Sequence, residues 1–209
     1  MRAVSFQTLR FTDVRWVDEL GSTNTERLAE ARCGAAEGVV LVADHQTAGR
    51  GRLGRRWESP PGSSLLVSVL LRPTVALERA HLLTMAAGLA ASEAVLDAAG
   101  VTAGLKWPND LVVDDAKLAG LLAESVVERA ELRALVVGMG LNVEAEPAEG
   151  STSLARLSES PVDRRALLDA WLTCFDTRLD ALDEVLVDYR RRCSTLHRTV
   201  RVEQADGIF

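Results

Sequence analysis

The chain has 209 residues, of which 24 are basic and 30 acidic, so its formal net charge is −6. Hydrophobic residues make up 47% and charged residues 26%, a composition that is typical of folded globular proteins and excludes an intrinsically disordered chain. The acidic balance argues against nonspecific nucleic-acid binding, which depends on an excess of Lys and Arg. Arginine has largely replaced lysine: of the 24 basic residues, two are lysines, Lys106 and Lys117.

Three features predict a cytoplasmic protein without membrane contact. Cys33, Cys174 and Cys193 are far apart and lack metal-ligand spacing, so we expect free thiols in a reducing compartment. Residues 1–11 lack the apolar core of a signal peptide. No uncharged apolar run approaches the ~18 residues of a membrane span.

Apolar periodicity predicts strands and helices that alternate along the chain. The predicted strands are 10–18, 39–43, 65–71, short strands within 104–127 around a turn at Asp114–Asp115, 131–143, and a strand-like stretch at 197–209. The predicted helices are 23–33, 77–99, 163–182 and 183–192. Thr23 and Glu26 have the spacing of a capping box. This order predicts an α+β domain of the two-layer α/β type, in which helices flank a mixed β-sheet.

The loop after the second predicted strand contains Gly49–Gly54, which formally satisfies the dinucleotide-binding pattern GxGxxG. A dinucleotide-binding loop opens directly into a helix, but RRWESPP at 55–61 cannot begin one. What remains is a loop with four arginines and no acidic residue among them: Arg50, Arg52, Arg55 and Arg56. Such a cluster repels itself unless an anion arrives, so it favours an anion-binding site over a solvated charged turn.

Both lysines lie in segments with further chemical groups. In Lys106-Trp107-Pro108-Asn109-Asp110, the proline ends any helix, so the Lys, Asn and Asp project from a strand end. Asp110 can hold Mg²⁺ or, equally, cap a turn. Lys117 enters an apolar run, where its ammonium requires an anionic partner unless it reaches the surface.

A fourth segment, GMGLN, ends the predicted strand 131–143. Gly138 and Gly140 lack side chains, so they thin the wall of a binding site at the end of this strand. The Asn142 amide either recognises a base edge or belongs to an ordinary turn. The histidines show no metal spacing, and no Ser/His/Asp triad stands out. The combination predicts binding of a polyphosphate, with electrostatic stabilisation of nucleotidyl transfer and no enzyme nucleophile.

The chain resembles the biotin protein ligase family in four motifs, which occur in this order: GRGRLGRRW, KWPNDL, KLAGLL and GMGLN. The preceding GSTN and Gln46 match this family as well. The resemblance implies a class II synthetase-like catalytic domain of the biotin/lipoate ligase type over residues 1–195. It implies that residues 196–209 are the incomplete start of a C-terminal SH3-like barrel. It also implies the ligase-only form, without an N-terminal DNA-binding domain.

The resemblance implies a biotin–[biotin carboxyl-carrier protein] ligase. Such an enzyme condenses biotin with ATP, in the presence of Mg²⁺, to biotinyl-5′-AMP. It then transfers biotin to a lysine of the biotin carboxyl carrier domain of a biotin-dependent carboxylase. Two alternatives stay open: a lipoate or octanoate–protein ligase, whose loop is typically of the RRxxGGG type, and a non-catalytic biotin-binding module.

The matched positions imply a role for each candidate residue. The catalytic residues would be Lys117, Arg52 and Lys106. Biotin would be bound by Ser22, Thr23, Asn24, Gln46, Gly49, Arg50, Gly51, Arg52, Lys117, Gly120 and Gly138. ATP and the adenylate would be bound by Arg52, Arg55, Trp57, Lys106, Asn109, Lys117 and Asn142, with Asp110 on Mg²⁺.

Overall fold

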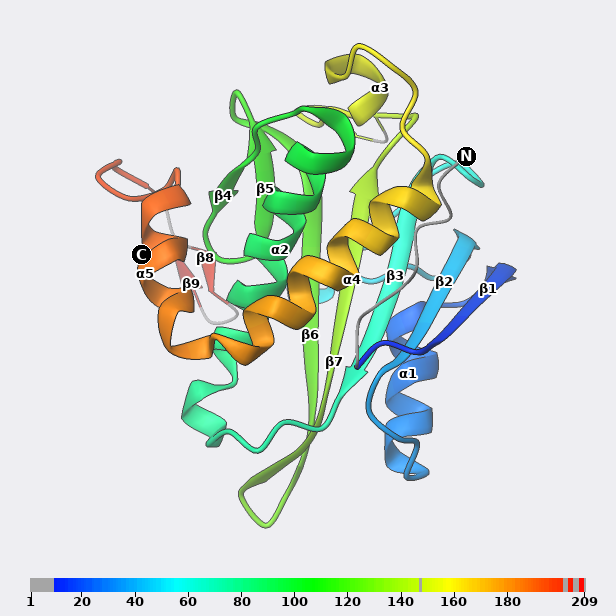
Figure 1. Ribbon diagram of the computed structural model, residues 1–209, viewed down its shortest axis with the longest axis vertical. Helices are drawn as coiled ribbons and strands as arrows, with labels where there is room; N and C mark the ends of the chain where they lie inside the picture. The colour runs from blue at the N-terminus through cyan, green and yellow to red at the C-terminus, as the bar shows by residue number, and fades with distance from the viewer. Residues whose placement is uncertain (1–9, 147, 201–202, 205–206, 209) are drawn as a thin grey trace.

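The structure, a computed structural model, describes residues 10–146, 148–200, 203–204 and 207–208. Seven strands form one sheet in the order β1-β2-β3-β7-β6-β5-β4 (Figure 1). Their bounds are β1 Asp13–Leu20, β2 Val39–Gln46, β3 Ser64–Leu71, β4 Gly104–Lys106, β5 Asp110–Val113, β6 Ala116–Glu128 and β7 Glu131–Asn142. β1 pairs with β2 in parallel and the other neighbours are antiparallel, which confirms the predicted mixed sheet.

The helices also follow the predicted order, with one addition. Their bounds are α1 Thr23–Arg32, α2 His81–Ala99, α3 Leu154–Leu157, α4 Arg164–Asp180 and α5 Leu182–Arg192. The sequence did not predict α3, because four residues are too short to show a helical period. Short 3₁₀ turns occur at Arg52–Gly54 and Leu77–Arg79.

At the two ends of the chain, part of what the sequence predicts lies outside the described residues. This holds for residues 1–9, which the sequence predicts not to form a signal peptide, and for parts of the strand-like stretch 197–209. Within that stretch, β8 (Glu203–Gln204) pairs with β9 (Gly207–Ile208) in an antiparallel hairpin. The implied start of a barrel stays a prediction.

Helices cover both faces of the sheet (Figure 1). On β3, Val69 and Leu71 belong to the large core with α2 and α4, whereas Leu70 packs with Leu28 of α1. Because alternate side chains of a strand point to opposite faces, α1 lies on the face opposite α2 and α4. β3 is buried along its whole length for the same reason.

α2 is the central helix of the larger core. By length and composition, the described stretch Leu77–Ala99 is apolar enough to cross a membrane. Here most of α2 is buried, and Trp171 of α4 donates its indole N–H to the carbonyl oxygen of Ala87 at 3.1 Å. The apolar residues of α2 are thus buried between the sheet and α4.

The start of α1 differs from its prediction. Ser22 is the N-cap residue, and its side chain makes no capping hydrogen bond. The capping box between Thr23 and Glu26 is therefore wrong. The Thr23 hydroxyl instead lies 3.0 Å from Oε1 of Gln46, at the end of β2, so a tertiary contact takes the place of the local one.

Candidate active site

A cavity of about 750 Å³ brings the four sequence motifs together. The predicted site residues that line it are Ser22, Thr23, Asn24, Gln46, Arg50, Gly51, Arg52, Arg55, Trp57, Lys106, Asn109, Asp110, Lys117, Gly120 and Gly138. Gly49 and Asn142, which were also predicted, are not among its lining residues. The cavity is therefore built from segments separated by more than a hundred residues along the chain.

The glycines of β7 make room for two side chains. Gly138 and Gly140 follow Val136 at intervals of two, so all three face the α1 side of the sheet. A Cβ atom on Gly138 would lie 2.1 Å from Oδ1 of Asn24, and one on Gly140 would lie 2.4 Å from Cε2 of Trp57. This confirms that the two glycines thin the wall of the site.

One end of the cavity is polar. Gln46 Oε1 accepts hydrogen bonds from the backbone N–H of Thr23 at 2.7 Å and from its hydroxyl at 3.0 Å. Asn24 lies beside them, but its Nδ2 already donates to Leu122 O and Glu124 Oε2, and Ser68 Oγ donates to its Oδ1. The Gln46 Nε2 group is therefore better placed than Asn24 to donate to a ligand, whereas both donors of Thr23 are already bonded to Gln46 Oε1.

The glycine–arginine loop folds back on itself. Gly51 N donates to Arg55 O at 2.7 Å, and Trp57 N donates to Gly49 O at 3.0 Å. After the short 3₁₀ turn, Arg55 is extended, with ψ 153°, so the loop does not open into an α-helix and the dinucleotide-binding interpretation stays rejected. Gly49 packs beneath the loop, where a Cβ would lie 2.3 Å from Trp57 O.

The loop arginines have partners that the sequence argument missed. Arg50 forms a two-point contact with Glu124, with its Nη2 2.7 Å from Oε1 and its Nη1 3.1 Å from Oε2. Arg52 Nη1 donates to Asn109 Oδ1 at 3.3 Å. The loop thus contacts β6 on one side and the KWPND segment on the other. The expectation that only a bound anion compensates the positive charge of the loop arginines is wrong, because Glu124 supplies a carboxylate.

The two lysines both line the cavity. Nζ of Lys117 lies 2.8 Å from Oδ1 of Asp110 and 5.6 Å from the centroid of the Trp57 ring. The predicted anionic partner of Lys117 is therefore Asp110. The Trp57 indole Nε1 is buried without a hydrogen-bond acceptor in the described part of the chain, so it can donate to a bound ligand.

Asn142 lies behind Lys117 instead of in the cavity wall. Its Nδ2 donates to Thr152 O at 3.0 Å and reaches Lys117 O at 3.5 Å. Thr152 N also donates to Lys117 O, at 2.9 Å. In this structure Asn142 therefore fixes the backbone of Lys117, and its predicted contact with adenine stays a prediction.

The residues that follow α5 hold the KWPND segment, residues 106–110, in place. Ser194 N donates to Leu105 O at 2.8 Å, and Trp107 N donates to the hydroxyl of Thr195 at 2.9 Å. Cys193 forms an isolated parallel bridge with Leu105, so the segment 193–195 runs beside β4.

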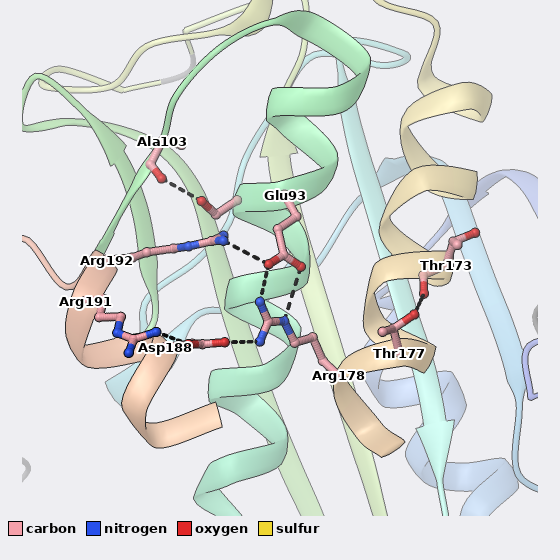
Figure 2. Close-up of polar contacts among 9 residues, drawn as sticks. Glu93, Ala103, Thr173, Thr177, Arg178, Asp188, Arg191 and Arg192 are labelled. Carbon is pink, nitrogen blue, oxygen red and sulfur yellow. Dashed lines mark hydrogen bonds and ion pairs between the residues drawn. The ribbon is translucent and has the colours of Figure 1, made fainter. Parts of the chain in front are cut away.

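An ion cluster fixes α5 itself (Figure 2). Arg178 of α4 bonds both Glu93 of α2 and Asp188 of α5, and Arg192 Nη2 lies 3.0 Å from the same Glu93 carboxylate. Hydrogen bonds to Glu93 and Asp188 raise the pKa of the Arg178 guanidinium above its ordinary value, although its partial burial acts against the shift. The cluster thus joins the core helices to the segment that holds the cavity rim.

Within the described residues, no group of three or more His, Cys, Asp or Glu side chains could hold a metal ion. Asp110 is the carboxylate that lines the cavity. Mg²⁺ is commonly bound by one or two carboxylates together with substrate phosphates. The donor set therefore fits a magnesium ion that is bound together with a phosphate ligand.

Comparison with known proteins identifies the family to which this fold belongs. Residues 20–142 match the profile of the biotin/lipoate A/B protein ligase family. The biotin–[acetyl-CoA-carboxylase] ligase of Mycobacterium tuberculosis is 39% identical over 203 residues, which cover 91% of this chain and 74% of that protein. The bifunctional ligase/repressor BirA of Bacillus subtilis is 35% identical over 168 residues, and the chain spans about half of its length, 52%.

Solved structures agree with the sequence comparison. The biotin protein ligase of Aquifex aeolicus in complex with biotin and ATP superposes with a TM-score of 0.81 and 31% identity, over 95% of this chain and 85% of that one. The matched residues 20–142 include every motif that lines the cavity. The chain belongs to the biotin/lipoate A/B protein ligase family.

Proposed function

We propose that this chain is a biotin–[biotin carboxyl-carrier protein] ligase, which activates biotin with ATP and transfers it to a lysine of a carrier domain. The observation that carries the proposal is the division of one cavity into two ends. Thr23 and Gln46 form a polar end, and Lys117 with the arginine loop forms a cationic end. The names of the Mycobacterium and Aquifex proteins, a ligase for a carboxylase and a complex with biotin and ATP, support it.

The two ends match the two ends of biotin. Its ureido ring offers one carbonyl and two N–H groups, which the polar groups of Thr23 and Gln46 can pair. Its carboxylate would then lie toward Lys117 and Arg52, where the α-phosphate of ATP must also come. The cationic side chains screen the repulsion between these two anions and hold them together.

In the first step a carboxylate oxygen of biotin attacks the α-phosphorus, and the bond to the bridging oxygen breaks, so pyrophosphate leaves. Lys117 would stabilise the negative charge of the pentacovalent transition state. Asp110, together with phosphate oxygens, would hold Mg²⁺, which supplies further positive charge to the triphosphate.

In the second step the amine of the acceptor lysine attacks the biotinyl carbonyl. The new C–N bond forms as the C–O bond to AMP breaks, and the amine loses a proton. The arginine loop, which already contacts β6 and Asn109, would cover the mixed anhydride and keep water from it.

We place this reaction in the cytoplasm, with no nucleic-acid or membrane partner.

The polar end distinguishes biotin from lipoate and octanoate. The dithiolane ring of lipoate and the alkyl chain of octanoate offer neither a carbonyl nor an N–H group to Thr23 and Gln46. Either acid would cover the Gln46 N–H₂ group without offering it an acceptor, and one polar group left unpaired in this way costs roughly 1–3 kcal/mol. Biotin is therefore the expected acid.

Exchange of labelled pyrophosphate into ATP tests the first step. We expect exchange with biotin and none with lipoate or octanoate. Transfer of labelled biotin to a carrier domain, with ATP and Mg²⁺, tests the second step. Exchange with lipoate alone would make the chain a lipoate ligase, and biotin binding without any adenylate would make it a non-catalytic binding module.

A further inference from the structure

Glu124, on β6, receives hydrogen bonds from two elements of the site. Its Oε2 accepts from Asn24 Nδ2 at 3.0 Å and from Arg50 Nη1 at 3.1 Å, and its Oε1 accepts from Arg50 Nη2 at 2.7 Å. The Glu124 side chain is 20% exposed, whereas that of Arg50 is 46% exposed. The less exposed carboxylate thus anchors the more exposed arginine.

The Asn24 side of this contact leads into the polar end of the cavity. Asn24 Oδ1 accepts from Ser68 Oγ at 2.6 Å, and Ser68 Oγ lies 2.7 Å from the Thr23 hydroxyl. That hydroxyl is bonded to Gln46. A continuous chain of polar contacts therefore runs from Gln46 to Glu124.

The Arg50 side leads into the arginine loop. Arg50 is the first arginine of that loop, and the loop returns to the sheet at Trp57, which packs against Gly140. Holding Arg50 on β6 therefore fixes the start of the loop next to the cavity. Glu124 does not line the cavity, so it acts on a ligand only through Asn24 and Arg50.

We propose that Glu124 is a positioning residue that joins the polar end of the cavity to the arginine loop and holds this loop over the site. The role requires a carboxylate, because three hydrogen bonds are accepted by its two oxygens. A carboxamide has one acceptor oxygen, and its N–H₂ group would face a donor of Arg50 or Asn24. The effect on biotin rests on the proposed function, whereas the anchoring of the loop does not.

Limited digestion of the ligand-free chain with trypsin tests the anchoring. We expect cleavage after the loop arginines to be about fivefold faster in Glu124→Gln, and Glu124→Asp to restore part of the protection. The matched control is Glu131→Gln, which removes a carboxylate 2.6 Å from Arg133 at the start of β7 and should leave loop cleavage unchanged. Wild-type cleavage rates in Glu124→Gln would overturn the proposal.

A double-mutant cycle separates anchoring from general loosening of the fold. Arg50→Ala should itself speed cleavage after Arg52, and adding Glu124→Gln should then have little further effect. Additive effects of the two changes would show that Glu124 acts by another route, and would also overturn the proposal.

Kinetics test the consequence for biotin. In Glu124→Gln we expect the KM for biotin in pyrophosphate exchange to rise about fivefold while kcat changes less than about twofold, because Glu124 contacts neither reactant. A fall in kcat at unchanged KM would overturn the proposal. If wild-type protein shows no exchange with biotin, the proposed function fails, and the digestion result still decides whether Glu124 anchors the loop.

Discussion

The ammonium nitrogen of Lys117, on β6, lies 2.8 Å from a carboxylate oxygen of Asp110, on the neighbouring strand β5. The two strands shift register between Leu111 and Val112, so that Lys117 pairs with Val112 and Gly120 pairs with Asp110. The Trp57 ring contacts the same region, with Lys117 Nζ 5.6 Å from its centroid. A compact cation is thus held between a carboxylate and an aromatic ring, at the wall of the cavity.

Lys117→Arg should reduce pyrophosphate exchange by about a hundredfold or more while the protein stays folded. A guanidinium is wider than an ammonium, so it cannot take the place of the compact charge that lies 2.8 Å from Asp110. Exchange rates and thermal unfolding, measured side by side, check this. Exchange near the wild-type rate would remove Lys117 from the chemical step.

Gly140→Ala should weaken ATP binding through Trp57. The added methyl group would lie 2.4 Å from Cε2 of Trp57, so the indole has to move. We expect an altered tryptophan emission spectrum and about a tenfold higher KM for ATP. Gly21→Ala is the control, because a Cβ there meets nothing within 4 Å. An unchanged KM with a shifted spectrum would show that Trp57 does not contact the nucleotide.

Arg52→Gly should speed the release of biotinyl-AMP, by about tenfold. The substitution removes the contact of the loop with Asn109 and also one cation near the adenylate phosphate. The dissociation rate of labelled adenylate, measured by dilution into unlabelled ligand, reports the change. Arg133→Gly, in a remote surface ion pair, serves as control. Equal rates in Arg52→Gly and wild type would exclude the loop from adenylate retention.

Local patterns in the sequence predicted most of the fold. Strands and helices with a clear period were found, because each buries one face. Their ends were less well predicted. β2 continues to Gln46, three residues beyond its apolar run, because Glu19 and Leu20 of β1 pair with His45 and Gln46. Pairing with a neighbouring strand, which the local pattern does not contain, sets that boundary.

The candidate site was predicted as a set of motifs, without the residues that hold them. Glu124 meets Arg50 across 74 residues, and Thr195 meets Trp107 across 88. Neither contact has a periodic or motif signal, because each depends on how β6 and the segment after α5 pack in three dimensions. The same holds for Asn24, whose amide groups are taken up by Leu122, Glu124 and Ser68.

Thr195→Val should raise the KM for ATP by about threefold, with little change in kcat. The valine has the shape of threonine but cannot accept the bond from Trp107 N, so the KWPND segment is less well fixed; one such bond contributes roughly 1 kcal/mol. Thr195→Ser keeps the hydroxyl and should behave like wild type. If the serine and valine variants have the same KM, the hydroxyl does not position this segment.

Alkaline destabilisation should depend on Tyr189 of α5, which is 5% exposed. Burial raises the pKa of its phenol, and the charges of Cys193 and Asp110 add to this shift. The folded state therefore keeps the neutral phenol above pH 10, where an unfolded tyrosine ionises, so this stability is complete below about pH 10 and is lost as the pH rises further. Urea unfolding at pH 9 and pH 11 measures the loss. In Tyr189→Phe, the fall in unfolding free energy between the two should be smaller by about 1.4 kcal/mol. Equal falls in both proteins would show that the phenol ionises freely in the folded chain.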